Sequence, residues 1–291
     1  MDVAQFIIYG LINGALYGLV ALGLALAFGI MGYLNVAHGD LIMLAAYGSF
    51  WLFKIWHVDP FLSIPLMMVV MFAAGVLLYV AVFSHLSKFA ILDRLKNSIL
   101  VSFGLIMVFT NMATVLWTAD ERCTTPFYSG MVIDIAGLRL PYIGLATIAL
   151  AIIITLALHM FLTKTYFGKA IRATAQDWEA AELMGIDIAR TYLFSFAFAI
   201  ATAGIAGSVI STSVVSPSIG MDWTNYGLVL VILAGVGNID AILPAGLLLG
   251  VVEAISVYLA GVPYTGVAGL VMFVLVLMLR PQGLFRGRAA L

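Results

Sequence analysis

The sequence predicts an all-α fold, a polytopic bundle of membrane-spanning helices. Of its 291 residues, 64% are apolar and only 9% are charged, and the mean hydropathy is +1.15. A soluble domain carries about 25% charged residues, so a chain of this size could not bury so much apolar surface in water. A lipid bilayer is therefore the expected solvent.

Nine apolar runs are separated by polar or glycine-rich stretches, and their lengths predict eight to nine spans. A helix needs about 20 residues to cross a hydrocarbon core of about 30 Å. Run 41–53 reaches that length only if its helix begins near Asn35, and run 226–236 is also short. The runs are 6–31, 41–53, 61–83, 99–117, 142–162, 192–215, 226–236, 242–260 and 264–279.

The whole chain, 1–291, is predicted to be one transmembrane domain, because its polar stretches are too short for a separate soluble domain. Its first five residues contain Asp2 and no Lys or Arg. Secretory signal peptides begin with a positive region, so we expect the first apolar run to be a retained span.

The distribution of basic residues predicts which polar segments face the cytoplasm, because cytoplasmic loops are enriched in Lys and Arg. Segments 84–98 and 163–190 and the residues after 279 are expected inside. Segment 118–141, where acidic neighbours offset two arginines, is expected outside, and so is the N-terminus if all three early runs cross. Ten of the 13 basic residues lie in the inner segments: Lys88, Arg94, Lys96, Lys164, Lys169, Arg172, Arg190, Arg280, Arg286 and Arg288.

Two glycine-rich interruptions follow the same pattern and predict broken helices. Residues 18–20 precede an interruption at 29–35, and residues 227–229, with the same Gly-Leu-Val sequence, precede one at 235–238. Paired interruptions of this kind are typical of internal repeats in transporters. In a chain with 28 glycines, chance explains the match as well as an internal repeat does, so both interpretations stay open.

A second glycine pattern concerns helix packing. Gly10, Gly14 and Gly18 are four residues apart in the first run, with Asn13 among them. Small residues at this spacing allow the backbones of two membrane helices to approach closely. We therefore expect a packing face along the first helix.

Signatures of catalysis, metal binding and cofactor binding are absent from the sequence. Gly168-Lys169 is followed by Ala170 and lacks the preceding glycine of a Walker A motif, so the chain has no phosphate cradle. No Gly-x-Ser-x-Gly elbow is present, and Cys123 is the single cysteine. The four histidines are far apart. A net charge of −1 gives no basic footprint for nucleic acid. We expect a non-enzyme without cofactor, metal or nucleic-acid partner.

Segment 163–190 is the most polar internal stretch and predicts an amphipathic helix over 170–184 that ends at Gly185. Its polar side is acidic, whereas membrane-surface helices favour Lys and Arg. The acidic side therefore favours docking into a groove of a soluble partner. The expected apolar stripe comprises Ile171, Ala175, Trp178, Ala181 and Leu183 or Met184, and the acidic residues are Asp177, Glu179 and Glu182.

Part of this segment resembles the EAA motif of ABC importer permeases. Glu179-Ala180-Ala181 is followed, after three further residues, by Gly185, and the flanking sequence resembles permeases for branched-chain amino acids. The resemblance covers nearly the whole chain, and the length fits the shorter of that family's two paired permease subunits. Asp40 departs from the pattern, where glutamate is expected, but it keeps the charge. Further matches are 35–40, 235–238, 280–285, Asn13-Gly14, Gly18 and Glu253.

This resemblance implies a subunit of a larger assembly in a bacterial inner membrane. The partners would be a second permease subunit, two cytoplasmic ATP-binding subunits and an extracytoplasmic solute-binding protein. The helix at 170–184 would transmit movement of the ATPases to the gate. The residues implicated in this coupling are Gly168, Arg172, Trp178, Glu179, Ala180, Ala181 and Gly185. For Arg172 and Glu179 the alternative is a solvated helix face.

Polar residues within the apolar runs are candidates for the translocation path, because unpaired polar groups are costly there. They are Asn35, His38, Asp40, Asn238 and Glu253. A helix that starts near His38 would direct its N-terminal amides towards a solute carboxylate; the favoured alternative is a polar turn in a cytoplasmic loop, with Asp40 capping the next helix. Glu253 either lines the path or, as we favour, holds two helices together.

The function that follows is a permease subunit of an ABC importer. The alternative is a stand-alone channel or secondary transporter for a small neutral solute, with Glu253 or His38 as an ion site. Such a carrier would not need the acidic amphipathic helix. The resemblance implies leucine, isoleucine or valine as substrate, but related permeases carry urea, amides or other amino acids, so the substrate stays open.

Overall fold

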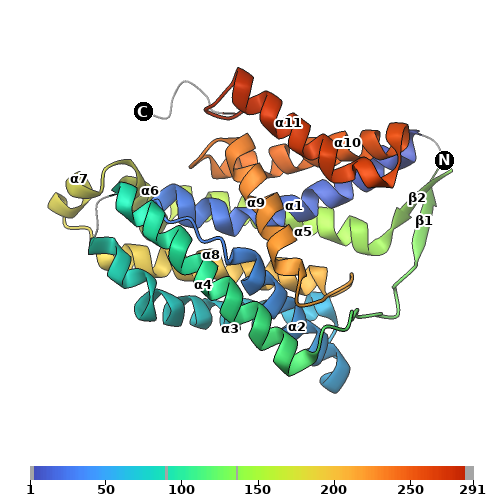
Figure 1. Cartoon of the computed structure of the whole chain (residues 1–291), viewed down its shortest axis with the longest axis horizontal. Coiled ribbons are helices and arrows are strands. Elements are labelled where there is room, and N and C mark those ends of the chain that lie inside the picture. The colour runs from blue at the N-terminus through green and yellow to red at the C-terminus, as the bar shows by residue number, and fades with distance from the viewer. Residues whose placement is uncertain (1–2, 89–90, 136, 286–291) are drawn as a thin grey trace.

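The computed structural model describes residues 3–88, 91–135 and 137–285, and it is built almost entirely of helices (Figure 1). The predicted all-α class is confirmed. The described α-helices are α1 (Val3–Met31), α2 (His38–Trp56), α3 (Pro60–Ala81), α4 (Ile91–Trp117), α5 (Tyr142–Lys164), α6 (Tyr166–Gln176), α7 (Trp178–Leu183), α8 (Ile188–Ile210), α9 (Ile219–Ala234), α10 (Ile242–Ala260) and α11 (Thr265–Leu279). Short 3-10 turns occupy η1 (Phe83–Lys88), η2 (Ile239–Ala241) and η3 (Val262–Tyr264), and β1 (Val132–Ile135) pairs antiparallel with β2 (Leu138–Pro141).

Among the described residues, seven helices are long and apolar enough to cross a membrane: α1, α3, α4, α5, α8, α10 and α11. Two further helices adjoin the predicted interruptions: α2, of 19 residues, follows the first, and α9 precedes the second. α2 begins at His38, close to the predicted start, and α9 has only 16 residues. The predicted membrane bundle is confirmed by these seven helices. α2 and α9 are not among them, so a count of eight to nine spans stays a prediction.

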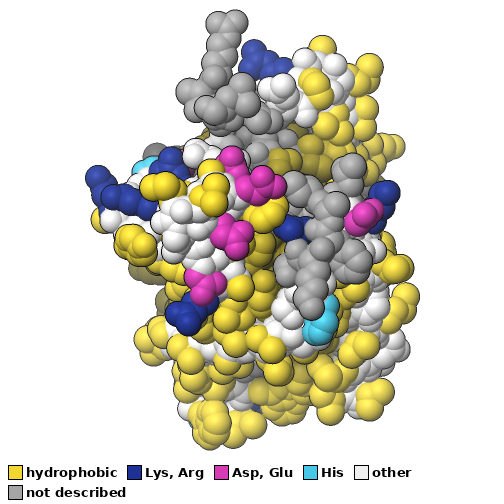
Figure 2. All heavy atoms as spheres, turned by 90° about the vertical axis from the view of Figure 1, so that its left-hand side faces the viewer, with side chains coloured by type: hydrophobic (Ala, Val, Ile, Leu, Met, Phe, Trp, Pro, Cys, Tyr) yellow, Lys and Arg dark blue, Asp and Glu magenta, His cyan; other side chains and the backbone are white. Residues whose placement is uncertain are grey.

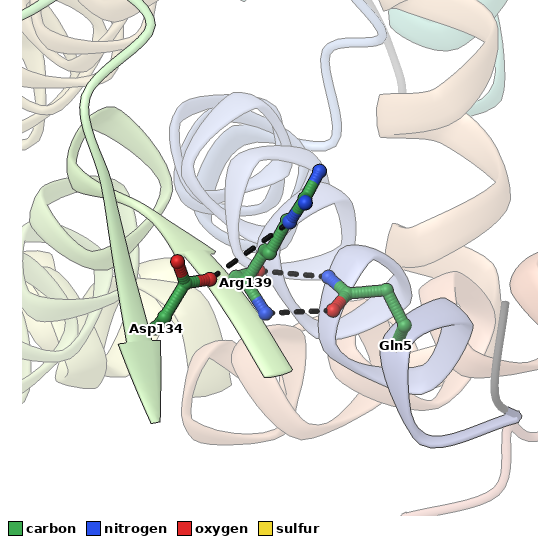
Figure 3. A network of polar contacts seen from close by, with 3 residues as sticks. All are labelled: Gln5, Asp134 and Arg139. Carbon is green, nitrogen blue, oxygen red and sulfur yellow. Dashed lines mark hydrogen bonds and ion pairs between the residues drawn. The ribbon is translucent and has the colours of Figure 1, made fainter. Parts of the chain in front are cut away.

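At one end of the bundle, the first turn of α1 is joined to the β-hairpin (Figure 3). The side-chain amide of Gln5 donates to the carbonyl of Arg139 at 2.8 Å and accepts its N–H at 2.8 Å. Across the hairpin, Arg139 forms a 3.9 Å ion pair with Asp134. The N-terminal turn and the hairpin therefore share one end of the molecule, as expected if three early runs cross.

The opposite end carries α6, α7 and the beginning of α4, at the left of Figure 1. Figure 2 looks onto this end and shows basic and acidic side chains gathered on a surface that is otherwise largely hydrophobic. The charged residues of segment 163–190 thus lie away from the hairpin. Arg286 and Arg288 lie outside the described residues, as does the side chain of Lys88. Which end faces the cytoplasm stays a prediction.

The core is built around α1 and α8, the two most deeply buried of the long helices. α1 packs closely along α10 because glycines face each other. A Cβ added at Gly10 would lie 2.5 Å from the carbonyl oxygen of Gly250, and one added at Gly14 would overlap the carbonyl oxygen of Gly246. The predicted packing face of the first helix is confirmed.

The two glycine-rich interruptions lie between helices that pack against each other. The first separates α1 from α2, and the second separates α9 from α10. α1 packs on α10 and α2 packs on α9, so the two helix pairs are interleaved. Gly29 lies against Gly237, and Gly39 lies against Gly220. That the two pairs descend from a repeat stays a prediction.

Candidate functional site

Segment 163–190 folds as two helices, and the predicted single helix over 170–184 is wrong. α6 ends at Gln176, α7 begins at Trp178, and Asp177 between them has extended backbone angles (φ −154°, ψ 102°). The Asp177 carboxylate accepts the N–H of Ala180 at 3.0 Å, which is the bond of an N-cap residue. Asp177 therefore starts a new helix instead of continuing the first.

The break at Asp177 also divides the predicted apolar stripe, which is not a single face. Ile171 is 1% exposed and belongs to the core, whereas Ala175 is exposed. Leu183 and Met184, at the end of α7, are 89% and 84% exposed. The apolar surface that a soluble partner can reach is therefore the tip of α7 (Leu183 and Met184), and Ile171 cannot contact it.

Some of the residues implicated in coupling are buried within the chain, and others are exposed on its surface. A Cβ at Gly168 would overlap the carbonyl oxygen of Phe161, so a glycine is needed where α6 folds back on the end of α5. Trp178 is half-buried. Gly168 and Ala181 are buried, and Arg172, Glu179, Ala180 and Gly185 are exposed.

Gly185 ends α7 as the sequence predicts. Its φ of +85° lies in the left-handed region that favours glycine. The N–H of Gly185 donates to Glu182 at 2.9 Å, and the N–H of Ile186 donates to Ala181 at 3.1 Å. These bonds satisfy carbonyls at the end of the helix. No atom of the described residues lies within 4 Å of a Cβ built at Gly185, which leaves room there for a partner.

Trp178 contacts Arg94, a residue for which the sequence predicts only a place in a basic inner segment. The guanidinium of Arg94, at the beginning of α4, lies 5.8 Å from the centre of the Trp178 ring, within the range of a cation–π interaction. Arg94 is 8% exposed. This contact joins α7 to α4.

The predicted path residues near the beginning of α2 form a buried polar turn. Asn35, His38 and Asp40 are each 1–2% exposed. The favoured alternative expected a polar turn in a cytoplasmic loop; the turn is present, but its side chains do not reach solvent in this chain. Whether they contact solute stays a prediction. Asp40 does not cap α2: it lies in the first turn, and the N–H of Gly39 is satisfied by Thr224 Oγ1 at 2.9 Å.

Several polar atoms of this turn have no partner among the described residues. They are Asn35 Nδ2, His38 Nε2 and Asp40 Oδ2. The other carboxylate oxygen of Asp40 accepts a hydrogen bond from Thr110 in α4 at 2.9 Å. A buried donor or acceptor without a partner costs free energy, so this turn has polar groups that a ligand could satisfy.

Glu253 lies elsewhere, between α1 and α10. It is 3% exposed, and Tyr17 donates its hydroxyl to Oε2 at 2.9 Å. This bond joins α1 to α10. Whether Glu253 serves only to hold these helices or also lines the path stays a prediction. Oε1 has no hydrogen-bond partner in the described part of the chain. A pocket of about 180 Å³ beside it is lined partly by Asn13 and Thr265.

Asn238 is separate from both polar regions. It is half-buried, and its side-chain amide donates to the carbonyl of Phe285 at 3.0 Å. The N–H of Leu284 donates to the carbonyl of Leu233 at 2.8 Å. These bonds fasten the segment after α11 to the end of α9. The five predicted path residues therefore do not form one site. Asn35, His38 and Asp40 share one buried turn, whereas Glu253 and Asn238 lie elsewhere.

Sequence reasoning did not single out the partners of these residues. Tyr17, Thr110 and Thr224 are far from Glu253, Asp40 and Gly39 in the sequence. One signal was present in α4, where Arg94, Ser98, Ser102 and Thr110 recur at multiples of four residues. Within the described residues, no group of three or more His, Cys, Asp or Glu side chains could hold a metal ion.

Comparison with known proteins finds a family and relatives that match nearly the whole chain. A family model described as "Branched-chain amino acid transport system / permease component" matches residues 6–279. BraD of Pseudomonas aeruginosa, a high-affinity branched-chain amino acid transport system permease protein, is 26% identical over 290 residues, covering 96% of this chain and 94% of that protein. No solved structure gives a significant match.

Two further relatives carry the same description. LivH of Salmonella typhimurium is 26% identical over 288 residues, which cover 94% of this chain and 92% of that protein. LivH of Escherichia coli K12 is 25% identical with the same coverage. Together with the long apolar helices, these matches establish a multi-pass membrane protein. The chain belongs to the family of permease components of branched-chain amino acid transport systems.

Proposed function

We propose that this chain is the membrane-spanning permease subunit of an ABC importer and forms part of the path for branched-chain amino acids or a similar small solute. The observation that carries the proposal is the family match over 6–279 in a bundle of long apolar helices. The names of the relatives support amino acids as the substrate class.

The assembly we propose contains a second permease subunit, two cytoplasmic ATP-binding subunits and an extracytoplasmic solute-binding protein. Since the sequence has no Walker A motif, ATP hydrolysis is assigned to the separate subunits. Within the single transmembrane domain 1–291, segment 163–190 is the proposed coupling element and the end that carries it is cytoplasmic. Its charged and apolar surface at the end remote from the hairpin supports docking there (Figure 2).

The tip of α7 is the proposed anchor for an ATP-binding subunit. Leu183 and Met184 are exposed apolar side chains, with the acidic Glu179 and Glu182 beside them in the sequence. Buried apolar anchors contribute most of the binding energy of an interface, and charges at its rim contribute less. Gly185 offers open space next to this anchor, and Arg172 is a further exposed charge.

Co-purification with the candidate ATP-binding subunits tests this function. Leu183→Glu and Gly185→Trp should each reduce the amount of ATP-binding subunit retained by tenfold or more, and ATP-driven uptake should fall in parallel. Glu182→Gln alters a neighbouring rim charge and should retain the complex. Uptake that needs no ATP-binding subunit and responds to Glu253→Gln would instead support a stand-alone carrier.

A further inference from the structure

α4 buries a short row of polar side chains against the rest of the molecule. Residues four apart are neighbours on a helix and form a ridge. Arg94, Ser98 and Ser102 follow one such ridge, and each is at most 8% exposed. On other faces, Leu100 and Met107 are 73% and 65% exposed. Polar side chains of a membrane helix that face the bundle commonly mark a pathway or a functional site.

The ridge lies against the buried turn before α2. Ser98 Oγ accepts the N–H of Leu34 at 3.1 Å. Farther along α4, Thr110 donates to Asp40 Oδ1 at 2.9 Å. Ser102 Oγ is 3.3 Å from the Leu34 carbonyl oxygen, but its shortest bond, 2.6 Å, stays within α4. Few short hydrogen bonds therefore hold this contact together, and each contributes only modestly to stability.

Beneath α4 lie polar groups whose hydrogen bonding is incomplete. Asn35 Nδ2 is a donor and Asp40 Oδ2 is an acceptor, and neither has a partner among the described residues. Both side chains are 1% exposed. An amide donor and a carboxylate acceptor are the groups that the carboxylate and ammonium of an amino acid would complete. α4 is bonded to both ends of this turn, through Ser98 at Leu34 and through Thr110 at Asp40.

The inner end of α4 is connected to α7. Arg94, one helical turn before Ser98, places its guanidinium 5.8 Å from the centre of the Trp178 ring. Trp178 is the first residue of α7 and follows the Asp177 cap directly. α7 packs on α6 and α8, and its contact with α4 is made by Trp178 at Arg94. This contact lies one helical turn from Ser98, whose hydroxyl accepts the Leu34 N–H.

We propose that α4 is a movable cover over the turn 34–40, opened and closed from its inner end through the contact between Arg94 and Trp178. We take the movement of α4 to be driven by an ATP-binding subunit that displaces α7, and this part of the proposal rests on the proposed function. Opening breaks the hydroxyl bonds from α4 and uncovers the Asn35 amide and the Asp40 carboxylate. These two groups then bind the carboxylate and ammonium of the solute.

Amide hydrogen exchange tests the mechanical link without requiring transport. The full chain is studied in lipid nanodiscs, alone and with any subunits that co-purify. Ser98→Ala removes the acceptor of the Leu34 N–H and calibrates the signal of an open cover. Trp178→Leu keeps apolar bulk but removes the cation–π partner, and should speed exchange within 34–40 by about two- to fivefold.

Glu179→Gln, next to Trp178 and fully within α7, should leave exchange within 34–40 unchanged. Protection within the core of α1 should be the same in all variants, which shows that the fold is intact. If Ser98→Ala speeds exchange and Trp178→Leu leaves it at the native rate, α4 is not driven from α7 and the proposal fails. If Ser98→Ala has no effect, α4 does not cover the turn. If both variants speed exchange within 34–40 as expected but no ATP-binding subunit associates with the chain, the proposed function fails and the link between α7 and α4 stands.

Discussion

Single glycines determine how closely α1 and α10 approach. At Gly14 and Gly10, the nearest atom that a Cβ would meet is a backbone carbonyl oxygen of α10, which cannot rotate away as a side chain can. The sequence predicted this face because the spacing of four residues is visible within one helix. It did not identify Gly246 and Gly250 as the opposing surface, since that depends on which helices become neighbours.

Gly14→Ala should destabilise the protein by about 1–3 kcal/mol, because the new methyl group overlaps the Gly246 backbone. Thermal unfolding of the purified protein, followed by size-exclusion chromatography, measures the change. Gly104→Ala is the matched control, since Gly104 lies in α4 with nothing within 4 Å of a Cβ. Equal melting temperatures for the two variants would contradict close packing at Gly14.

At the scale of helices, the sequence predicts where α2 begins and where α7 ends, but it does not predict the break at Asp177. The beginning of α2 at His38 and the end of α7 at Gly185 follow local chemistry that the sequence displays. The break at Asp177 was missed because its neighbours are good helix formers and aspartate also occurs within helices. Only the bond from Ala180 to its carboxylate shows that it caps a second helix.

The candidate site shows the same division between local and distant information. Asn35, His38 and Asp40 could be grouped from the sequence because they are adjacent in it. Their burial and their bonding to α4 could not, since Thr110 lies 70 residues from Asp40. The polar ridge of α4 was hidden because a few serines and threonines barely lower the hydropathy of a long apolar run.

Asp177→Ala should loosen α7, whereas Asp177→Asn should not. An asparagine side chain caps a helix about as well as aspartate, and loss of the cap costs about 1 kcal/mol. We expect amide exchange within 178–184 to rise about fivefold in Asp177→Ala and to stay near the native rate in Asp177→Asn. Equally fast exchange in both variants would mean that charge, and not capping, holds α7.

At the scale of the whole molecule, the ends of the bundle differ in composition. One end holds the hairpin and the first turn of α1, and the other holds the charged α6 and α7 (Figures 1 and 2). Cys123, an exposed thiol, lies in the segment between α4 and the hairpin. The sequence predicted this separation from its basic residues, since Lys and Arg are concentrated in a few segments. The hydrogen bonds between Gln5 and Arg139 add a contact that composition could not predict.

Labelling of Cys123 by a membrane-impermeant thiol reagent should occur in intact cells, because segment 118–141, which contains it, is expected outside. In a Cys123→Ser background, Lys164→Cys places a thiol on an exposed residue at the other end of α5. That thiol should react only after the cells are lysed. The reverse pattern would invert the proposed orientation and place α7 beyond the reach of cytoplasmic ATP-binding subunits.

The bonds that fasten the segment after α11 to the end of α9 have a consequence for biosynthesis. Asn238 is joined to a carbonyl 47 residues later in the chain. At a translation rate of roughly 5–20 residues per second, that carbonyl is synthesised roughly 2–10 s after Asn238. During this interval α10 and α11 emerge while the turn after α9 still lacks its partner. This corner of the bundle therefore acquires its native form late, after the helices that flank it have been made.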